Sequence, residues 1–452
     1  MQSPEALAAT LLVHAGLPPA HLYVEGAEPV LPSSFRVDAA AAASIGAAAL
    51  AAAAIHAARG GARQTVTIAL RHAAAEFRSE QHAADTSVPK GEMWDPIAGL
   101  YPTGDGGQVR LHTNFPHHRD GILALLVAEY ARESVAKALL NWQAVQFETA
   151  ATARGMCVAA VRSFAEWDAH PHAAHLPAVP LTIARIAPAP PKPLPPVANR
   201  PLEGIRVLEL ARVIAGPVAG RTLAAHGADV LNITGPGVPN FPRLITDTGR
   251  GKRTAELDLN TDGGRAALAN LAATADVFLQ AYRTGALAAR GFAPEALAAI
   301  NPNIVVATLS AYGETGPWGC KRGFDSLVQT ATGLNHAEAA AAGTTTPKPL
   351  PCQALDHASG YLLALGTEAA LLRRHSEGGS WKVTVSLAAT ARWLRTLGRL
   401  ADGFATPGPA DIADLLERHG TITTVRHAAR LSATPARWSH PALPLGSGLA
   451  TW

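Results

Sequence analysis

Cysteine is scarce in this chain of 452 residues. The three cysteines, Cys157, Cys320 and Cys352, are scattered and odd in number, and no two of them form a CxxC pair. This pattern argues against a disulfide framework and gives no zinc motif, so no metal is predicted. A reduced, cytoplasmic setting is the simplest expectation.

Charge and long apolar runs are also limited. Charged residues make up 16% of the chain, and the formal net charge of +3 is too mild to predict a nucleic-acid partner. It does suit a small anionic ligand bound by a few arginines. No basic segment followed by a uniform apolar run opens the chain, so no secretory signal is expected. The longest apolar stretch, Ala39–Ala58, is mostly alanine and contains His56, which favours a buried helix over a membrane span.

With 48% hydrophobic residues the chain is globular, and its length predicts two or three domains. The sequence APAPPKPLPP at Ala187–Pro196 predicts a stiff linker, set at residues 188–200. After it, an apolar strand at Ile205–Leu210, a helix at Pro217–His226 and a second strand at Ala228–Ile233 form a βαβ unit.

The alternation of strand and helix continues as far as Leu387. The expected elements are helices at Gly264–Thr274, Pro294–Ile300 and Gly360–Ser376 and strands at Asp276–Gln280, Ile304–Ser310 and Lys382–Leu387. The predicted fold class is therefore α/β, with an open, mostly parallel, Rossmann-like sheet in a large domain at 201–397. A tail segment follows at 398–452.

The first half of the chain is organised differently. Arg110–Thr113 is a predicted strand, and Ile122–Leu140 and Trp142–Arg154 are predicted helices, which indicates a smaller α+β domain at 95–187.

An internal repeat links the two ends of the chain. TVTIAL at Thr65–Leu70 matches KVTVSL at Lys382–Leu387, and an alanine-rich helix ending in a glycine pair precedes each strand. Residues 34–80 therefore look like a second copy of residues 351–397. The segment 1–94 is predicted to be a degenerate fragment of the large domain.

Five segments in the large domain resemble the class III CoA-transferases (CaiB/BaiF type), a family that includes formyl-CoA transferase, carnitine CoA-transferase and the α-methylacyl-CoA racemases. The segments are PLEGIRVLELARVIAGPVAGRTLAAHGADV (201–230), GRGKRTAELDL (249–259), ADVFLQAYRTGALAARGF (275–292), AYGETGPWGCKRGFDSLVQTATG (311–333) and ALDHASGYLLALGTEAALLRR (354–374). The resemblance implies an enzyme that moves CoA from an acyl-CoA donor to a small carboxylic acid. It also implies a homodimer.

Asp356 lies where this family has its catalytic aspartate. A carboxylate can attack a thioester carbonyl and form an anhydride, which the CoA thiolate converts to an enzyme thioester that the second acid attacks. Asp356 is expected just before a long helix that begins near Ser359, where the helix dipole favours a carboxylate. The alternative is that Asp356 only caps the helix. Asp325, in RGFD, matches a second acidic position of the family's site.

The resemblance also assigns residues to coenzyme A, the expected co-substrate. One expected arginine is missing after the second strand, where the chain has Gly235. Either Arg243, Arg250 or Arg253 replaces it, or the affinity for the nucleotide is lower. The assigned positions are Ile214, Ala215, Leu257, Asp258, Asn260, Tyr282, Arg283, Arg290, Arg322 and Phe324.

Two positions bear on which reaction is catalysed. Ile214 is apolar where oxalate-specific transferases have a polar residue, so oxalate is disfavoured. Phe324 replaces the histidine that moves the α-proton in the racemases, which disfavours racemisation. A racemase-like enzyme and a catalytically inactive CoA-binding homologue remain the alternatives. A nicotinamide-dependent oxidoreductase fits less well, because no GxGxxG follows the first strand.

The small domain, which normally follows the large one in this family, comes first here. Asp38 falls within one residue of the position that matches Asp356, but it lacks the surrounding motifs and is interpreted as a relic. His112, His117 and His118 form a cluster without a carboxylate or cysteine at ligand spacing, so a surface or interface cluster is expected rather than a metal site.

Overall fold

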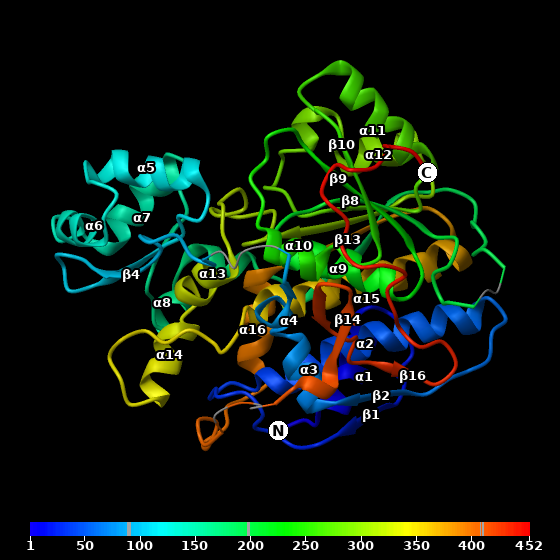
Figure 1. The fold of residues 1–452 in the computed structure, drawn as a ribbon, viewed down its shortest axis with the longest axis horizontal. Coiled ribbons are helices and arrows are strands. Elements are labelled where there is room, and N and C mark those ends of the chain that lie inside the picture. The colour runs from blue at the N-terminus through cyan, green and yellow to red at the C-terminus, as the bar shows by residue number, and fades with distance from the viewer. Residues whose placement is uncertain (88–91, 197–198, 407, 409–410) are drawn as a thin grey trace.

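The computed structural model describes residues 1–87, 92–196, 199–406, 408 and 411–452. Its centre is a seven-stranded sheet in the order β10-β9-β8-β11-β12-β13-β7 (Figure 1). The first six strands are parallel and follow the 3-2-1-4-5-6 order of a doubly wound sheet. The bounds are β8 Arg206–Leu210, β9 Asp229–Thr234, β10 Lys252–Glu256, β11 Val277–Gln280, β12 Val305–Ser310 and β13 Ser380–Ser386. The predicted α/β fold class is confirmed.

Strand β7 (Leu181–Ala187) differs from the sequence prediction, which placed these residues in the small domain. It runs antiparallel to β13 at the edge of the large sheet. The alternating segment LTIARIA has the composition of a strand, but only the distant partner strand decides which sheet it joins.

Both faces of the large sheet are covered by helices, because its buried strands have apolar side chains on each side. Val277 and Leu279 of β11 face the core shared with α9 (Ala215–Ala225) and α15 (Ala354–Glu377), whereas Phe278 faces the opposite core. The helices on that opposite face are α11 (Asp262–Thr274) and α12 (Pro294–Ile300).

The first 87 residues share the large domain's hydrophobic core. Helix α2 (Val37–Ala58) packs against α15, which is thereby enclosed between α2 and the sheet (Figure 1). By length and composition α2 could cross a membrane, but 94% of its most apolar 18-residue stretch is buried inside the protein. Its alanines allow α15 to approach closely. The elements here are α1 Pro4–His14, β1 Leu22–Glu25, α2 Val37–Ala58, β2 Val66–Ala69, α3 Leu70–Glu76, α4 Ser79–His82 and β3 Ala84–Asp85.

The two copies of the internal repeat have the same order of elements. Helix α2, strand β2 and helix α3 correspond to α15, β13 and α16 (Leu387–Thr396). Gly60 and Gly378 both end their helix with positive φ, at 89° and 70°, a conformation that favours glycine. Strand β2, however, pairs with β1 and β16 (Arg430–Leu431) in a separate three-stranded sheet rather than joining the large one.

The small domain forms a separate lobe with its own core (Figure 1). The predicted single helix at 122–140 is instead two helices, because Val127 adopts a left-handed conformation with φ 51° and ends the first of them. The elements are β4 Gly99–Pro102, β5 Gln108–Leu111, α5 Pro116–Leu126, α6 Arg132–Leu139, α7 Ala144–Ala153 and β6 Val158–Ala160.

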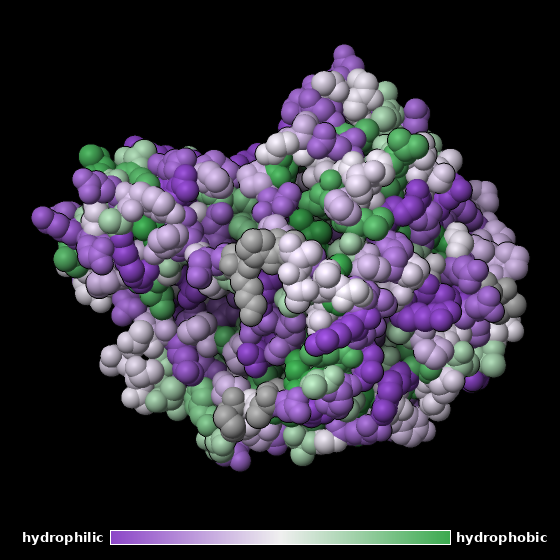
Figure 2. Space-filling view, viewed as in Figure 1, coloured by the Kyte–Doolittle hydropathy of each residue, from purple (hydrophilic) through white to green (hydrophobic). Residues whose placement is uncertain are grey.

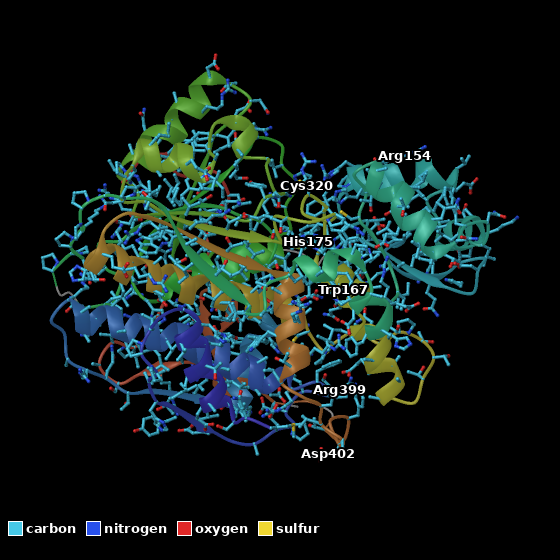
Figure 3. All side chains as sticks on the ribbon, turned by 180° about the vertical axis from the view of Figure 1, so that it is seen from behind. Arg154, Trp167, His175, Cys320, Arg399 and Asp402 are labelled. Carbon is cyan, nitrogen blue, oxygen red and sulfur yellow. The ribbon has the colours of Figure 1, made fainter. Side chains whose placement is uncertain are left out.

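The lobe is fastened to the large domain by a buried ion pair and by aromatic contacts. Glu148 of α7 accepts a hydrogen bond from Lys321 at 2.7 Å, and the Lys321 ammonium lies 3.6 Å from the centroid of the Trp318 ring. Trp167 and His175, in the connection back to the large sheet, lie at this junction (Figure 3). The remaining elements are α8 Phe164–Asp168, η1 Pro171–His175, α10 Pro242–Thr248, η2 Ala288–Arg290, α13 Asp325–Ala331, α14 Leu334–Ala341, η3 Ala413–Leu415, β14 Leu416–His419, β15 Ile422–Val425 and β16 Arg430–Leu431.

Candidate active site

A pocket of about 490 Å³ opens at the carboxyl ends of the parallel strands. It extends across the switch point between β8 and β11, where doubly wound sheets bind ligands. Figure 2 shows a notch between the small lobe and the part of the large domain that carries α11 and α12. Phe115, His117 and His118 line the pocket from the small domain.

The structure brings the residues assigned from the sequence together in this pocket. Its lining includes Ile214, Ala215, Leu257, Asp258, Asn260, Tyr282, Arg283, Arg290, Arg322, Phe324 and Asp356. The reason is topological: the segments that contain these residues follow parallel strands or pack beside them, so they meet at one edge of the sheet.

Asp356 belongs to the first turn of α15, which begins at Ala354 and not near Ser359 as predicted. The N-cap position is occupied by Gln353, so the alternative in which Asp356 caps this helix is wrong. The Asp356 side chain is nearly buried and lines the pocket at the positive end of the helix dipole.

Asp325 holds this helix start in place. Its Oδ2 atom accepts hydrogen bonds from the backbone N–H groups of Leu355, at 2.8 Å, and Asp356, at 3.0 Å. Two of the four N–H groups that a helix leaves unpaired are thus satisfied by a side chain from α13. Asp325 therefore positions the backbone that carries Asp356, and its own side chain is buried behind that backbone.

Burial raises the pKa of both carboxyls. The pKa of Asp325 rises to about 6, mainly through loss of solvent. The pKa of Asp356 lies well above its usual range because of burial first, and then because of the nearby charges of Asp325 and Glu80. A poorly solvated carboxylate with a raised pKa is a stronger nucleophile than one in water.

This electrostatic arrangement predicts a pH profile. The nucleophilic role that the family resemblance implies for Asp356 requires an ionised carboxyl, so the acid limb of the rate profile should lie above the ordinary range for aspartate. Replacing Asp325 with Asn removes a negative neighbour and leaves an oxygen that can cap the helix, so the acid limb should move to lower pH. Measurement of kcat/KM between pH 4 and 9 tests this, and a limb that stays in place would contradict the coupling.

The first βα turn contains a strained residue. Val213, which is β-branched, has φ 72° and lines the pocket just before Ile214 and Ala215. Such a conformation costs on the order of 1–3 kcal/mol and is concentrated at functional sites. No sequence signal marked it, since glycine is the residue expected at positive φ.

The proposed substitutes for the missing arginine are corrected by the structure. Arg250 is buried against Asp247, Arg253 binds Asp229 at 2.9 Å, and Arg243 donates to the Glu80 carbonyl at 2.8 Å. All three are occupied away from the pocket. Arg212, which the sequence assignment omitted, lines the pocket instead, beside β8.

The histidine cluster lies between the two domains. His112 is buried, with its ring stacked 3.8 Å from that of Phe324, and His118 Nε2 accepts a hydrogen bond from Arg322 at 3.1 Å. Burial lowers the pKa of each to about 3, so both rings are neutral near pH 7. His117 is exposed and lines the pocket together with His118, whereas His112 is buried between the two domains, so the cluster lies at a domain interface.

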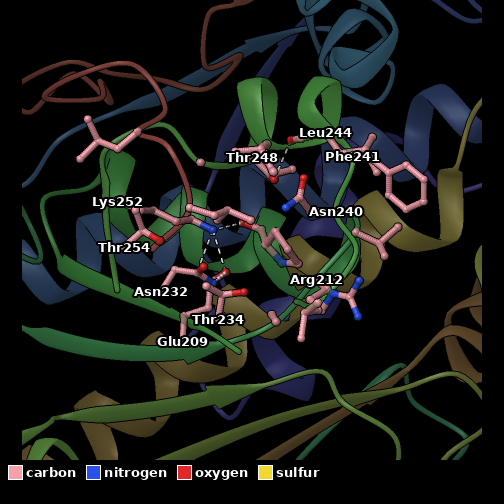
Figure 4. A pocket seen from close by; sticks show the side chains of 18 of the residues that line it. Glu209, Arg212, Asn232, Thr234, Asn240, Phe241, Leu244, Thr248, Lys252 and Thr254 are labelled. Atoms are coloured by element: carbon pink, nitrogen blue, oxygen red, sulfur yellow. Dashed lines mark hydrogen bonds and ion pairs between the residues drawn. The ribbon is translucent and has the colours of Figure 1, made fainter. Parts of the chain in front are cut away.

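A smaller cavity of about 60 Å³ adjoins the main pocket (Figure 4). On its floor Lys252 is buried and bonds to Glu209 at 2.7 Å and to the Pro217 carbonyl at 2.8 Å. Gly220 is required here, because a Cβ at that position would lie 1.8 Å from Glu209 Oε2. Lys252 and Glu209 thus form a buried ion pair beneath the first βα turn.

Part of the chain is similar in sequence to known proteins. Residues 202–406 match the model of CoA-transferase family III. A probable fatty acyl-CoA transferase of Mycobacterium tuberculosis is 34% identical over 52% of this chain and 64% of its own length. A succinate–glutarate CoA-transferase of Agrobacterium fabrum is 36% identical over 31% of this chain and 39% of its own length.

The other similar proteins include a cinnamoyl-CoA:phenyllactate CoA-transferase of Clostridium sporogenes, 33% identical over 42% of this chain and 50% of its own length. A solved structure of a CaiB/BaiF family protein from Brucella suis is 28% identical, covers 43% of this chain and 55% of that chain, and has a TM-score of 0.39. The chain spans less than two thirds of the length of each of these relatives.

Proposed function

We propose that this chain is a CoA-transferase that moves CoA from an acyl-CoA donor to a carboxylic acid acceptor through a covalent intermediate on Asp356. The observation that supports this most directly is the position of Asp356, an ionisable side chain at a helix start in a pocket of about 490 Å³. A pocket of that size and place can hold a nucleotide-bearing thioester.

In the proposed reaction an Asp356 oxygen attacks the thioester carbonyl, the C–S bond breaks, and CoA leaves as a thiolate. The product on the enzyme is an acyl–aspartyl anhydride. The thiolate then attacks the aspartyl carbonyl and releases the first acid, which leaves an aspartyl–CoA thioester. The acceptor acid attacks that thioester, and the same steps run in reverse. The first turn of α15 stabilises the oxyanions that develop during these steps.

Arginines of the pocket are proposed to bind the phosphates of CoA. Arg290 is oriented by hydrogen bonds to the Ala286 carbonyl at 3.2 Å and to Asn260 at 3.1 Å. Arg283, Arg322 and Arg212 lie on other walls of the same pocket. Planar guanidinium groups suit phosphate oxygens, and CoA carries a 3′-phosphate and a pyrophosphate that need such partners.

Mass spectrometry of the protein after incubation with a panel of acyl-CoAs tests this function. We expect at least one donor to add the mass of CoA or of the acyl group to the peptide that contains Asp356. An adduct on another residue would contradict the mechanism. CoA binding without any adduct would favour the alternative of an inactive CoA-binding homologue.

We propose further that the enzyme does not racemise 2-methylacyl-CoA substrates. Phe324 has no titratable proton, and His357, which follows Asp356, is wholly buried and bonded to Glu80. Incubation of such substrates in deuterated water should therefore leave the α-carbon unlabelled. Rapid deuterium incorporation at that carbon would show that another base acts in the pocket.

The homodimer and the cytoplasmic location are part of the same proposal. Helix α2 packs on α15 of the same chain. The N-terminal fragment at 1–94 therefore buries its apolar face without a second subunit. The dimer is instead implied by the family resemblance. Sedimentation at low micromolar concentration should show a species heavier than 46.8 kDa, and a single species of that mass would contradict it. Cys157 and Cys352 are buried and free, which suits a reducing compartment.

A further inference from the structure

The N-terminal fragment contacts the proposed nucleophile's helix from behind. Glu80, on α4, is 1% exposed, and its Oε2 atom lies 2.9 Å from Nε2 of His357. His357 follows Asp356 in the first turn of α15 and is itself 0% exposed. The His357 ring also stacks on Phe77 of the fragment, with ring centroids 5.5 Å apart and planes 27° apart.

The short helix α4 is itself held firmly. Ser79 donates a hydrogen bond to Asp247 at 2.8 Å and accepts one from Arg221 at 3.0 Å. Arg243 donates to the backbone carbonyl of Glu80 at 2.8 Å. Side chains from α9 and α10 of the large domain therefore hold the Ser79 hydroxyl and the Glu80 carbonyl, next to the Glu80 carboxylate.

The first turn of α15 is thus fixed at two points. Asp325 binds its backbone N–H groups, and Glu80 binds the side chain of the residue next to Asp356. A catalytic carboxylate must be held to within about 0.5 Å of its productive position. We propose that Glu80 is a positioning residue for the Asp356 carboxylate and acts through His357. This inference rests on the proposed function of Asp356.

It also gives the degenerate fragment a role in the site. Glu80 and Phe77 both lie in the segment that repeats part of the large domain, yet they contact the complete copy. Glu80 does not line the pocket, so it cannot touch substrate directly. Its contact with His357 acts on catalysis through the helix that it supports, and its charge acts on the Asp356 carboxyl without touching it.

Two substitutions separate the contact that Glu80 makes from the charge that it carries. Glu80→Gln keeps the side-chain length and an oxygen that accepts from His357 Nε2, but it removes the charge. Glu80→Asp keeps the charge but is one methylene shorter, which withdraws the carboxylate from His357. Both variants preserve a polar group in the buried site, so both are expected to fold.

We expect Glu80→Asp to lower kcat on the order of 100-fold, the effect of displacing a reacting group by about 1 Å. Its KM for acyl-CoA should change less than about threefold, because the CoA-binding residues lie elsewhere. Glu80→Gln should retain at least roughly a third of the wild-type kcat. Two results would contradict a positioning role for the contact between Glu80 and His357. One is a wild-type kcat in Glu80→Asp, and the other is a loss of kcat in Glu80→Gln as large as in Glu80→Asp.

Glu338→Gln is the matched control. Glu338 is equally buried and also joins the fragment to the large domain, by accepting a hydrogen bond from the Ser34 N–H at 3.2 Å, but it lies on α14. Its substitution should lower the melting temperature and leave kcat per folded molecule unchanged. An equal loss of kcat in this control would show that Glu80 acts only by stabilising the fold.

Failure of the inference and failure of the proposed function give different results. Wild-type protein that forms no adduct at Asp356 with any acyl-CoA contradicts the function. Wild-type protein that forms the adduct, with Glu80→Asp forming it at the same rate, contradicts only the role of Glu80.

Discussion

Replacing Asp356 with Ala is expected to abolish CoA transfer while leaving CoA binding nearly intact. The Asp356 carboxylate supplies the oxygen that forms the covalent intermediate in the proposed mechanism. The arginines proposed to bind CoA lie on other elements. Turnover with a donor that loads the wild type should fall to a trace, and the Kd for CoA, measured by calorimetry, should stay within about threefold. More than a trace of remaining turnover would contradict the mechanism.

Asp356→Glu should also fail. One added methylene moves the carboxylate by about 1 Å, and misplacement on that scale costs on the order of 100-fold in rate. The first turn of α15 cannot adjust freely, because Asp325 and Glu80 hold it from two sides. A Glu variant that turned over at the wild-type rate would show that the site is not rigid.

Asp38 offers a matched control within the same chain. It lies in the first turn of α2, the repeat's counterpart of α15, and accepts hydrogen bonds from the N–H groups of Val30, at 2.7 Å, and Leu31, at 3.2 Å. Burial raises its pKa to about 6, yet it does not line the pocket. Asp38→Ala should lower the melting temperature and leave turnover per folded molecule intact, as expected of a relic.

The parts of the fold that the sequence predicted are those determined by local patterns. Apolar runs such as Ile205–Leu210 and Ala228–Ile233 become buried parallel strands because both faces of the sheet must be covered. Once the strand order is that of a doubly wound sheet, the segments after the strands must converge on one edge. The assigned pocket residues therefore came together although they are up to about 140 positions apart in the chain.

What the sequence did not predict depends on contacts between distant segments. Nothing near His112 or His118 indicates that Phe324 and Arg322 will pack against them. Nothing near Glu80 indicates a histidine 277 residues away. The sequence of strand β7 is equally compatible with the end of the small domain and with the edge of the large sheet, because the partner strand decides the pairing.

Deleting residues 1–94 is expected to prevent folding of the large domain. The deletion removes α2, which encloses α15, and takes Glu76 away from Tyr361, to which it is bonded at 2.6 Å. Arg221, wholly buried, would lose Ser79 and the nearby charge of Glu76 while still paired with Asp247. Removing one partner from a buried ionic cluster costs about 3–5 kcal/mol, a large part of the 5–15 kcal/mol by which domains are stable.

The variant that lacks residues 1–94 should therefore be insoluble, or soluble but without a cooperative thermal transition. Arg71→Ala is the control, because Arg71 pairs with Asp414 at the surface, with side chains 42% and 62% exposed. Such a pair contributes on the order of 0–1 kcal/mol, so this variant should melt close to the wild type. A soluble, active dimer after the deletion would mean that α15 can be covered without α2, and that Glu80 and Phe77 are not needed to hold the start of the helix.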